Sequence, residues 1–121
     1  MNAKQIGIVN KRVIELLELD FFEEVPIMLG NSNIIHMKRE HLNDYNKYGA
    51  DIEEIIKEPT YVARNPKQDS IEYIKEYKIE NEFVLVAVRI SNKGKMFART
   101  LFVMTERKKQ KYISKGYAIK Y

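Results

Sequence analysis

Two histidines are the residues of this 121-residue sequence most suited to proton transfer. His36 lies on a segment with helical apolar spacing, and an imidazole can take up or release a proton near neutral pH. Glu40, one helical turn further on, either orients that imidazole or forms a surface pair with Arg39. His41 follows His36 by five residues, unlike the i, i+4 spacing of zinc-binding helices, so we expect no zinc site.

Arg89 interrupts the apolar run 83–90, which otherwise has the composition of a central strand. A guanidinium group in such a strand needs a partner, either a carboxylate at the sheet edge or a phosphate on an open face. Arg99 and Thr100 raise the same question in the next apolar run, 96–104. Because strand residues alternate between faces, only one of these two shares a face with Arg89.

The turn around Gly94 decides which residue that is. A loop of two or four residues places Arg89 diagonal to Thr100, whereas a three-residue loop with left-handed Gly94 brings Arg99 onto the face of Arg89. We favour Thr100, because two arginines crowded on an apolar sheet would repel each other.

Positive charge is concentrated at the C-terminal end of the chain. Residues 93–121 contain nine lysines and arginines and one acidic residue, a net charge of +8, whereas residues 1–92 carry −4. This asymmetry predicts a polyanion held against one side of the molecule, although a lysine-rich helix can also serve only for solubility. The predicted RNA phosphate ligands are Arg107, Lys108, Lys109 and Lys111.

The composition excludes several classes of site. The chain has no cysteine, glycine-rich phosphate loop, cofactor fingerprint or acidic cluster for magnesium, so we expect neither a metal nor a cofactor. Its apolar runs are far shorter than the roughly 18 residues of a membrane helix, and its N-terminus lacks a signal-peptide layout. We therefore expect a cytoplasmic protein without a membrane partner, folded as a single domain over residues 1–121.

The elements that must position these residues differ between the two halves of the chain. Short apolar stretches at 5–9 and 25–29 read as strands, and apolar spacing predicts helices at 11–19, 32–42 and 52–57. Strand-like runs follow at 60–64, 70–77, 83–90 and 96–104, joined by connections short enough only for antiparallel neighbours. We predict an α+β fold, with N-terminal helices packed on a four-stranded antiparallel β-meander and a basic C-terminal helix ending near Lys115.

Several segments, in this order, carry a resemblance to a known family: Ser32–His41, Glu58–Val62 with Asn65-Pro66, Ser70–Lys75, Leu85–Arg89 and Ala98–Phe102. Over roughly residues 6–115 the chain resembles the phage members of the superfamily named for barnase, EndoU, colicin nuclease domains and RelE. The resemblance implies N-terminal helices before a four-stranded antiparallel sheet, and a metal-independent ribonuclease.

The resemblance also implies an active site made of a helix histidine, a strand arginine or lysine and a strand serine or threonine. His36, Arg89 and Thr100 match these positions, with His41 and Arg99 as alternatives. The implied function is a metal-independent endoribonuclease, a toxin or effector of a phage or mobile element, in which the 2′-hydroxyl of RNA attacks the adjacent phosphate. Its partners would be RNA and an antitoxin or immunity protein. The alternative is an inactive RNA-binding or protein-interaction module on the same fold.

Overall fold

A computed structural model describes residues 3–90 and 94–121 of the chain. Its strands are Lys4–Val9 (β1), Val25–Leu29 (β2), Tyr61–Asn65 (β3), Ser70–Tyr77 (β4), Glu82–Ile90 (β5), Met96–Val103 (β6) and Ile119–Lys120 (β7). Its helices are Lys11–Leu16 (α1), Asn31–Glu40 (α2), Leu42–Tyr48 (α3), Ile52–Lys57 (α4) and Glu106–Ser114 (α5), with a short 3-10 turn, Gly49–Asp51 (η1), before α4. No helix in this described part is long and apolar enough to cross a membrane.

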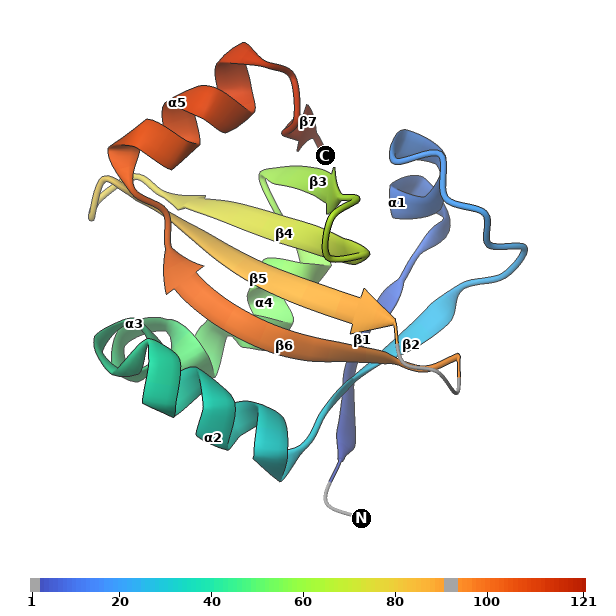
Figure 1. Cartoon of the computed structure of the whole chain (residues 1–121), viewed down its shortest axis with the longest axis horizontal. Helices are drawn as coiled ribbons and strands as arrows, with labels where there is room; N and C mark the ends of the chain where they lie inside the picture. The colour runs from blue at the N-terminus through green and yellow to red at the C-terminus, as the bar shows by residue number, and fades with distance from the viewer. Residues whose placement is uncertain (1–2, 91–93) are drawn as a thin grey trace.

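The strands form one seven-stranded sheet in the order β1-β2-β6-β5-β4-β3-β7 (Figure 1). Pairing is antiparallel except between β2 and β6, which run parallel. The prediction of a four-stranded meander preceded by helices is therefore wrong. The four predicted strands are only the centre of a mixed sheet, which β1 and β2 extend on one side and β7 on the other. The pairings of β2 with β6 and of β7 with β3 join distant parts of the chain, which no local pattern reveals.

A large apolar core lies on the face of the sheet that α1 to α4 cover, called here the helical face. Alternate residues of β5 point into it, and α2 and α4 contribute buried side chains from the other layer. These fully buried residues include Val84, Val86, Val88, Met37 and Ile55.

The opposite face, called here the open face, carries a smaller core and a single helix of the described chain. Tyr112 of α5 packs there with Leu85 and Ala87 of β5. Thr105 caps this helix, since its hydroxyl accepts from the Lys108 amide at 3.2 Å. Helix α5 therefore covers only part of the open face, on the β3–β4 side of the sheet (Figure 1).

Helices α2 and α3 lie along the edge of β6 that β2 leaves uncovered. Strand β2 pairs with β6 only at Met96 and Phe97. Beyond that point the Asp44 carboxylate of α3 accepts a hydrogen bond from the Val103 amide at 2.9 Å. This edge contact places α2, with His36, next to the strand that carries Arg99 and Thr100.

Candidate active site and basic pocket

The open face presents three rows of side chains across β3, β4, β5 and β6, because directly paired residues point to the same face. The first row is Asn65, Ser70, Arg89 and Phe97. The second row is Ala63, Glu72, Ala87 and Thr100. The third row is Tyr61, Ile74, Leu85 and Phe102. Charged groups are thus confined to the first two rows, and the Tyr61 hydroxyl is the only polar side-chain group of the third.

A β-bulge determines which residue of β6 shares the open face with Arg89. Arg89 pairs with Phe97, the register that a three-residue turn would produce; the turn itself, at residues 91–93, lies outside the described residues. Ala87 nevertheless pairs with Thr100, because Arg99 is an extra residue with no partner on β5. Thr100 therefore lies on the face of Arg89, and the bulge places it there.

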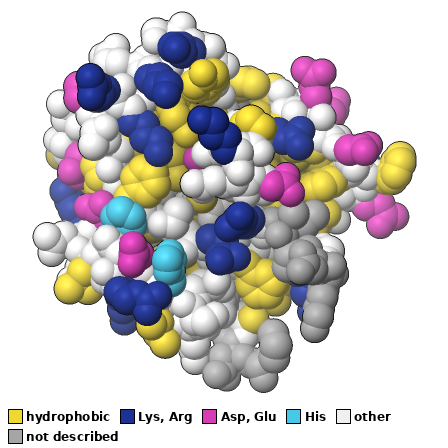
Figure 2. Space-filling view, in the orientation of Figure 1, with side chains coloured by type: hydrophobic (Ala, Val, Ile, Leu, Met, Phe, Trp, Pro, Cys, Tyr) yellow, Lys and Arg dark blue, Asp and Glu magenta, His cyan; other side chains and the backbone are white. Residues whose placement is uncertain are grey.

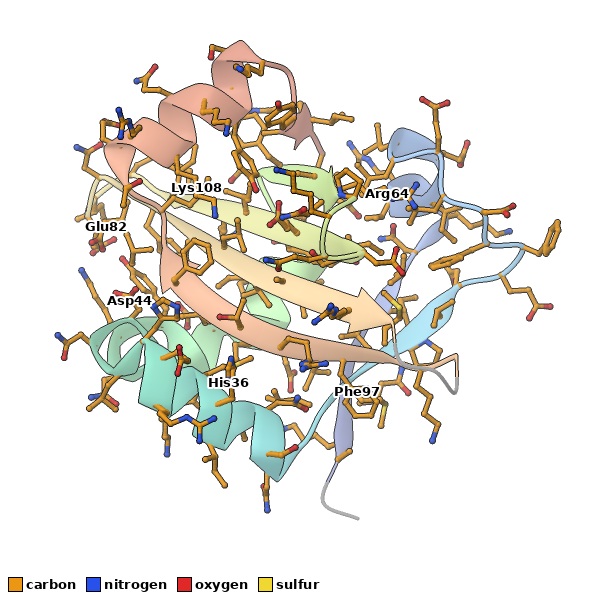
Figure 3. The ribbon with its side chains drawn as sticks, viewed as in Figure 1. His36, Asp44, Arg64, Glu82, Phe97 and Lys108 are labelled. Carbon is orange, nitrogen blue, oxygen red and sulfur yellow. The ribbon has the colours of Figure 1, made fainter. Side chains whose placement is uncertain are left out.

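His36 lines a cleft of about 670 Å³ at the beginning of α2. The other lining residues are Ala3, Gly30, Asn31, Ser32, Asn33, Arg39, Phe97 and Arg99. Figure 3 labels His36 on α2 and Phe97 near the beginning of β6, the strand beside that helix. The cleft combines one imidazole with two guanidinium groups, and no carboxylate of the described residues lines it.

The start of α2 fixes the position of His36. Gly30 is extended at the N-cap, and the Asn33 side chain accepts a hydrogen bond from its amide at 2.9 Å. One turn later Met37, with no exposed surface, anchors the helix on the sheet. Glu40 lies at the exposed end of α2, where it pairs with Arg39 at 3.8 Å. Of the two interpretations of Glu40, the structure therefore contains the surface pair.

His41 occupies a different environment from His36. It is the residue between α2 and α3, with φ −144° and ψ 61°, and it therefore leaves the helix that carries His36. Its ring lies 5.4 Å from that of Phe102, beside the apolar third row. His41 does not line the cleft.

The structure brings the predicted active-site residues together in two neighbouring groups. His36 shares the cleft with Arg99, whereas Arg89 and Thr100 share the open face of the sheet. Phe97 connects the groups, because it lines the cleft and also pairs directly with Arg89.

A second, strongly basic pocket of about 490 Å³ lies between α5 and the β3–β4 turn. Its lining residues are Arg64, Asn65, Pro66, Lys67, Thr105, Arg107, Lys108, Lys111, Tyr112 and Tyr117. Figure 2 shows lysine and arginine side chains gathered over α5, with the two histidines on the same surface. Of the four predicted phosphate ligands, Lys109 does not line this pocket: its ammonium lies 2.9 Å from the Glu106 carboxylate and 4.8 Å from the centre of the Phe83 ring.

Comparison with protein families assigns the chain. Residues 4–111 match the family model described as phage-Barnase-EndoU-ColicinE5/D-RelE like nuclease3. The chain belongs to this phage nuclease family. No curated protein and no solved structure matches it.

Two arginines of this phage nuclease carry charges that no carboxylate of the described residues balances. Neither Arg89 nor Arg99 has a carboxylate partner among the described residues, and both are exposed. Their charges are therefore available to phosphate oxygens. In the same part of the chain, no group of three or more histidine, aspartate or glutamate side chains is placed to hold a metal ion.

Sequence reasoning missed Glu72 and Ser70 of β4, which lie on the open face of this nuclease. Glu72 is 4% exposed and accepts a hydrogen bond from the Tyr112 hydroxyl at 2.7 Å. The pKa of Tyr112 is raised, mainly by burial and next by this hydrogen bond. Ser70 pairs directly with Arg89, and its buried hydroxyl has no hydrogen-bond partner among the described residues. The run 70–77 also contains Lys75 and Glu76, so the type of Glu72 alone does not single it out, unlike Arg89 in its apolar run.

Proposed function

We propose that this nuclease is an endoribonuclease that cleaves RNA without a metal ion, by attack of the 2′-hydroxyl on the adjacent phosphate. The observation that carries the proposal is the cleft, in which the imidazole of His36 lies with the unpaired guanidinium of Arg99. Because the nucleophile belongs to the substrate, the protein must supply only proton transfer and positive charge.

His36 would act as general acid or base at the reacting phosphate. Arg99, in the same cleft, and Arg89, which pairs with Phe97 at its border, would stabilise the charge that develops on the phosphoryl oxygens. Thr100 would donate a hydrogen bond from the second row. Basic residues of α5 would bind the flanking phosphates.

The chemistry of the products tests the mechanism. Purified protein should shorten labelled RNA in the presence of EDTA and leave a 2′,3′-cyclic phosphate or 3′-phosphate on one product and a 5′-hydroxyl on the other. An RNA with one 2′-deoxyribose at the cleaved position should bind but resist cleavage there. Activity that is lost in EDTA and restored by magnesium, with 5′-phosphate ends, would reject the mechanism in favour of a metal-activated water.

The role of His36 is tested by replacement. His36→Ala should lower the cleavage rate by about 100- to 10,000-fold, the usual contribution of an acid or base, with little change in stability. His41→Ala is the matched control, because His41 lies outside the cleft. Equal losses in the two variants would contradict the assignment of His36.

We further propose that the nuclease is a toxin or effector, because unregulated cleavage of RNA would harm the cell that makes it. Expression of the wild-type chain should arrest bacterial growth, whereas His36→Ala should not. An antitoxin or immunity protein would be the corresponding partner, and its co-expression should restore growth. Growth arrest by both forms would argue against toxicity through RNA cleavage.

The absence of a carboxylate among the described residues of the cleft favours a second candidate, an RNA-binding module without turnover. Such a module would lack a second acid or base to act with His36. It would shift labelled RNA in a gel without shortening it, which the cleavage assay detects directly.

A further inference from the structure

The walls of the basic pocket are held in place by contacts on both sides of α5. The Tyr112 hydroxyl bonds to buried Glu72 in the middle of the sheet. After α5, Gly116 adopts a left-handed conformation at φ 71° and turns the chain back. The chain then pairs as β7 with β3, the strand that leads into the other wall of the pocket. The pocket is therefore a built feature of the fold.

Five cationic side chains surround this volume of about 490 Å³: Arg64, Lys67, Arg107, Lys108 and Lys111. Of these five, only Arg64 forms an ion pair among the described residues, with Asp69 at 4.0 Å. Lys108 is held above the Phe102 ring at 4.7 Å, which directs its ammonium over the open face. Like charges at this density repel one another, and an anionic chain that binds several of them relieves that repulsion.

Tyr117 adds an aromatic surface to the same pocket. It is 46% exposed, and its ring meets Tyr112 edge-on, with ring centres 5.8 Å apart and planes at 87°. An exposed ring fixed at one edge can stack on an unpaired base. The pocket volume lies in the range of small-molecule sites and can hold a nucleotide rather than only a phosphate.

The first row of the open face links this pocket to the cleft. Asn65 lines the pocket at one end of the row, and Phe97 lines the cleft at the other. Three strand spacings, about 14 Å, separate these two residues. Between them the exposed Arg89 provides a cation, so positive charge continues from one site to the other.

We propose that the basic pocket is an exosite for single-stranded nucleic acid, which binds phosphates through its five cations and stacks one unpaired base on Tyr117. The proposal rests on the proposed function in taking RNA as the substrate. RNA bound in this exosite would cross Arg89 and enter the cleft at His36, so the exosite would hold nucleotides next to the cleaved bond.

Binding measured without cleavage tests the exosite. The His36→Ala protein keeps RNA intact, and fluorescence anisotropy of a labelled single-stranded RNA gives its affinity in that background. Adding Arg64→Gln and Lys67→Gln together should weaken binding about tenfold or more and reduce the slope of log affinity against log salt by about 1.4. The matched control is Lys115→Gln, which removes an exposed charge next to α5 but outside the pocket.

Stacking is tested separately from charge. Tyr117→Ala should weaken binding of single-stranded RNA by about 5- to 100-fold, whereas Tyr117→Phe should keep it. A duplex RNA of equal length should bind more weakly to the parent protein and respond less to Tyr117→Ala, because its bases are already stacked. Thermal unfolding of each variant verifies that the fold is intact.

The exosite would be disproved if Arg64→Gln with Lys67→Gln loses no more affinity than Lys115→Gln, or if Tyr117→Ala binds single-stranded RNA as its parent does. Pocket-dependent binding by a wild-type protein that cuts no RNA would retain the exosite and reject the endoribonuclease. Cleavage that is unaffected by the pocket variants, together with unchanged binding, would retain the endoribonuclease and reject the exosite.

Discussion

The helical and open faces of the sheet come from the same strands, yet they hold different kinds of side chain. On β5, Val88 is completely buried against the helices, while its neighbour Arg89 is exposed on the open face. On β6, Leu101 is completely buried and Thr100 is half-buried on the opposite side. The helical face therefore supplies most of the apolar burial that stabilises the fold, and this leaves the other face able to carry polar groups.

Each face also contains a tyrosine that donates its hydroxyl to a glutamate. Tyr48 of α3 bonds to Glu82, which also accepts from Lys47 at 2.7 Å and whose side chain is 29% exposed. Tyr112 of α5 bonds to Glu72, which is nearly inaccessible. The ring of Tyr48 belongs to the large core, so the attachment of α3 depends little on its hydroxyl, whereas α5 depends more on a single buried hydrogen bond.

Two neighbouring positions of β6 give the largest expected contrast. Leu101→Ala should lower the free energy of unfolding by about 2–5 kcal/mol, because it opens a cavity in the large core. Thr100→Val should change it little but reduce the cleavage rate. Urea unfolding and RNA cleavage, both corrected for the folded fraction, measure the two effects. A stability loss of equal size at Thr100 would show that the open face is also structural.

The arginines test whether positive charge on the open face acts in catalysis. Arg89→Ala and Arg99→Ala should each lower the cleavage rate by at least ~100-fold, the scale of a lost contact to developing charge, without loss of stability. Lys115→Ala is a control for a general loss of positive charge. If only Arg99→Ala impairs cleavage, the reaction is confined to the cleft and Arg89 has no catalytic role.

The tyrosine of the open face should matter more for stability than its counterpart on the helical face. Tyr112→Phe leaves the buried Glu72 carboxylate without its donor and should reduce the free energy of unfolding by about 1–3 kcal/mol. Tyr48→Phe should lower it by about 1 kcal/mol at neutral pH, because Glu82 retains Lys47. Equal losses of stability in the two variants, measured by urea unfolding, would contradict the expected difference between the Tyr112–Glu72 and Tyr48–Glu82 hydrogen bonds.

Alkaline pH should produce the smallest effect of the series. Burial, then the hydrogen bond to Glu82, raises the pKa of Tyr48 from 10.0 to about 12. The contribution of the protonated Tyr48 hydroxyl to the free energy of unfolding is complete below pH 10 and is lost as the pH rises towards 12. The reason is that the unfolded chain releases the hydroxyl proton at a lower pH than the folded chain does. The stability of Tyr48→Phe should therefore fall less steeply over this interval than that of the wild type. Parallel curves would show that Tyr48 does not titrate with unfolding.

Local patterns in the sequence were sufficient for most elements of the second half of the chain. The runs 70–77 and 83–90 and the basic helix correspond closely to β4, β5 and α5, because strand-like apolar runs and a threonine cap are local signals. The membership of the phage nuclease family, suggested by the order of several segments, is confirmed by the match over residues 4–111. In contrast, α3 and β7 have no counterpart among the predicted elements.

The candidate site could be predicted only in part from the sequence, for a physical reason. The sequence singled out His36, Arg89 and Arg99 by their types, because a cation or an imidazole within an apolar pattern is conspicuous, and Thr100 as the neighbour of Arg99 that matches the resemblance. The positions of the last three relative to one another depend on a bulge, and a one-residue shift in register exchanges the two faces of a strand.

The sequence by itself determined the classes of side chain available to this nuclease: imidazole, guanidinium and a basic C-terminal helix, without cysteine. Only the tertiary structure decided that β2 and β7 complete the sheet, that His36 shares its cleft with Arg99, and that Arg64 faces α5 across a pocket. These arrangements join residues far apart in the chain. Their geometry follows from strand pairing and helix packing over the whole sheet, so it cannot be read from spacing within one segment.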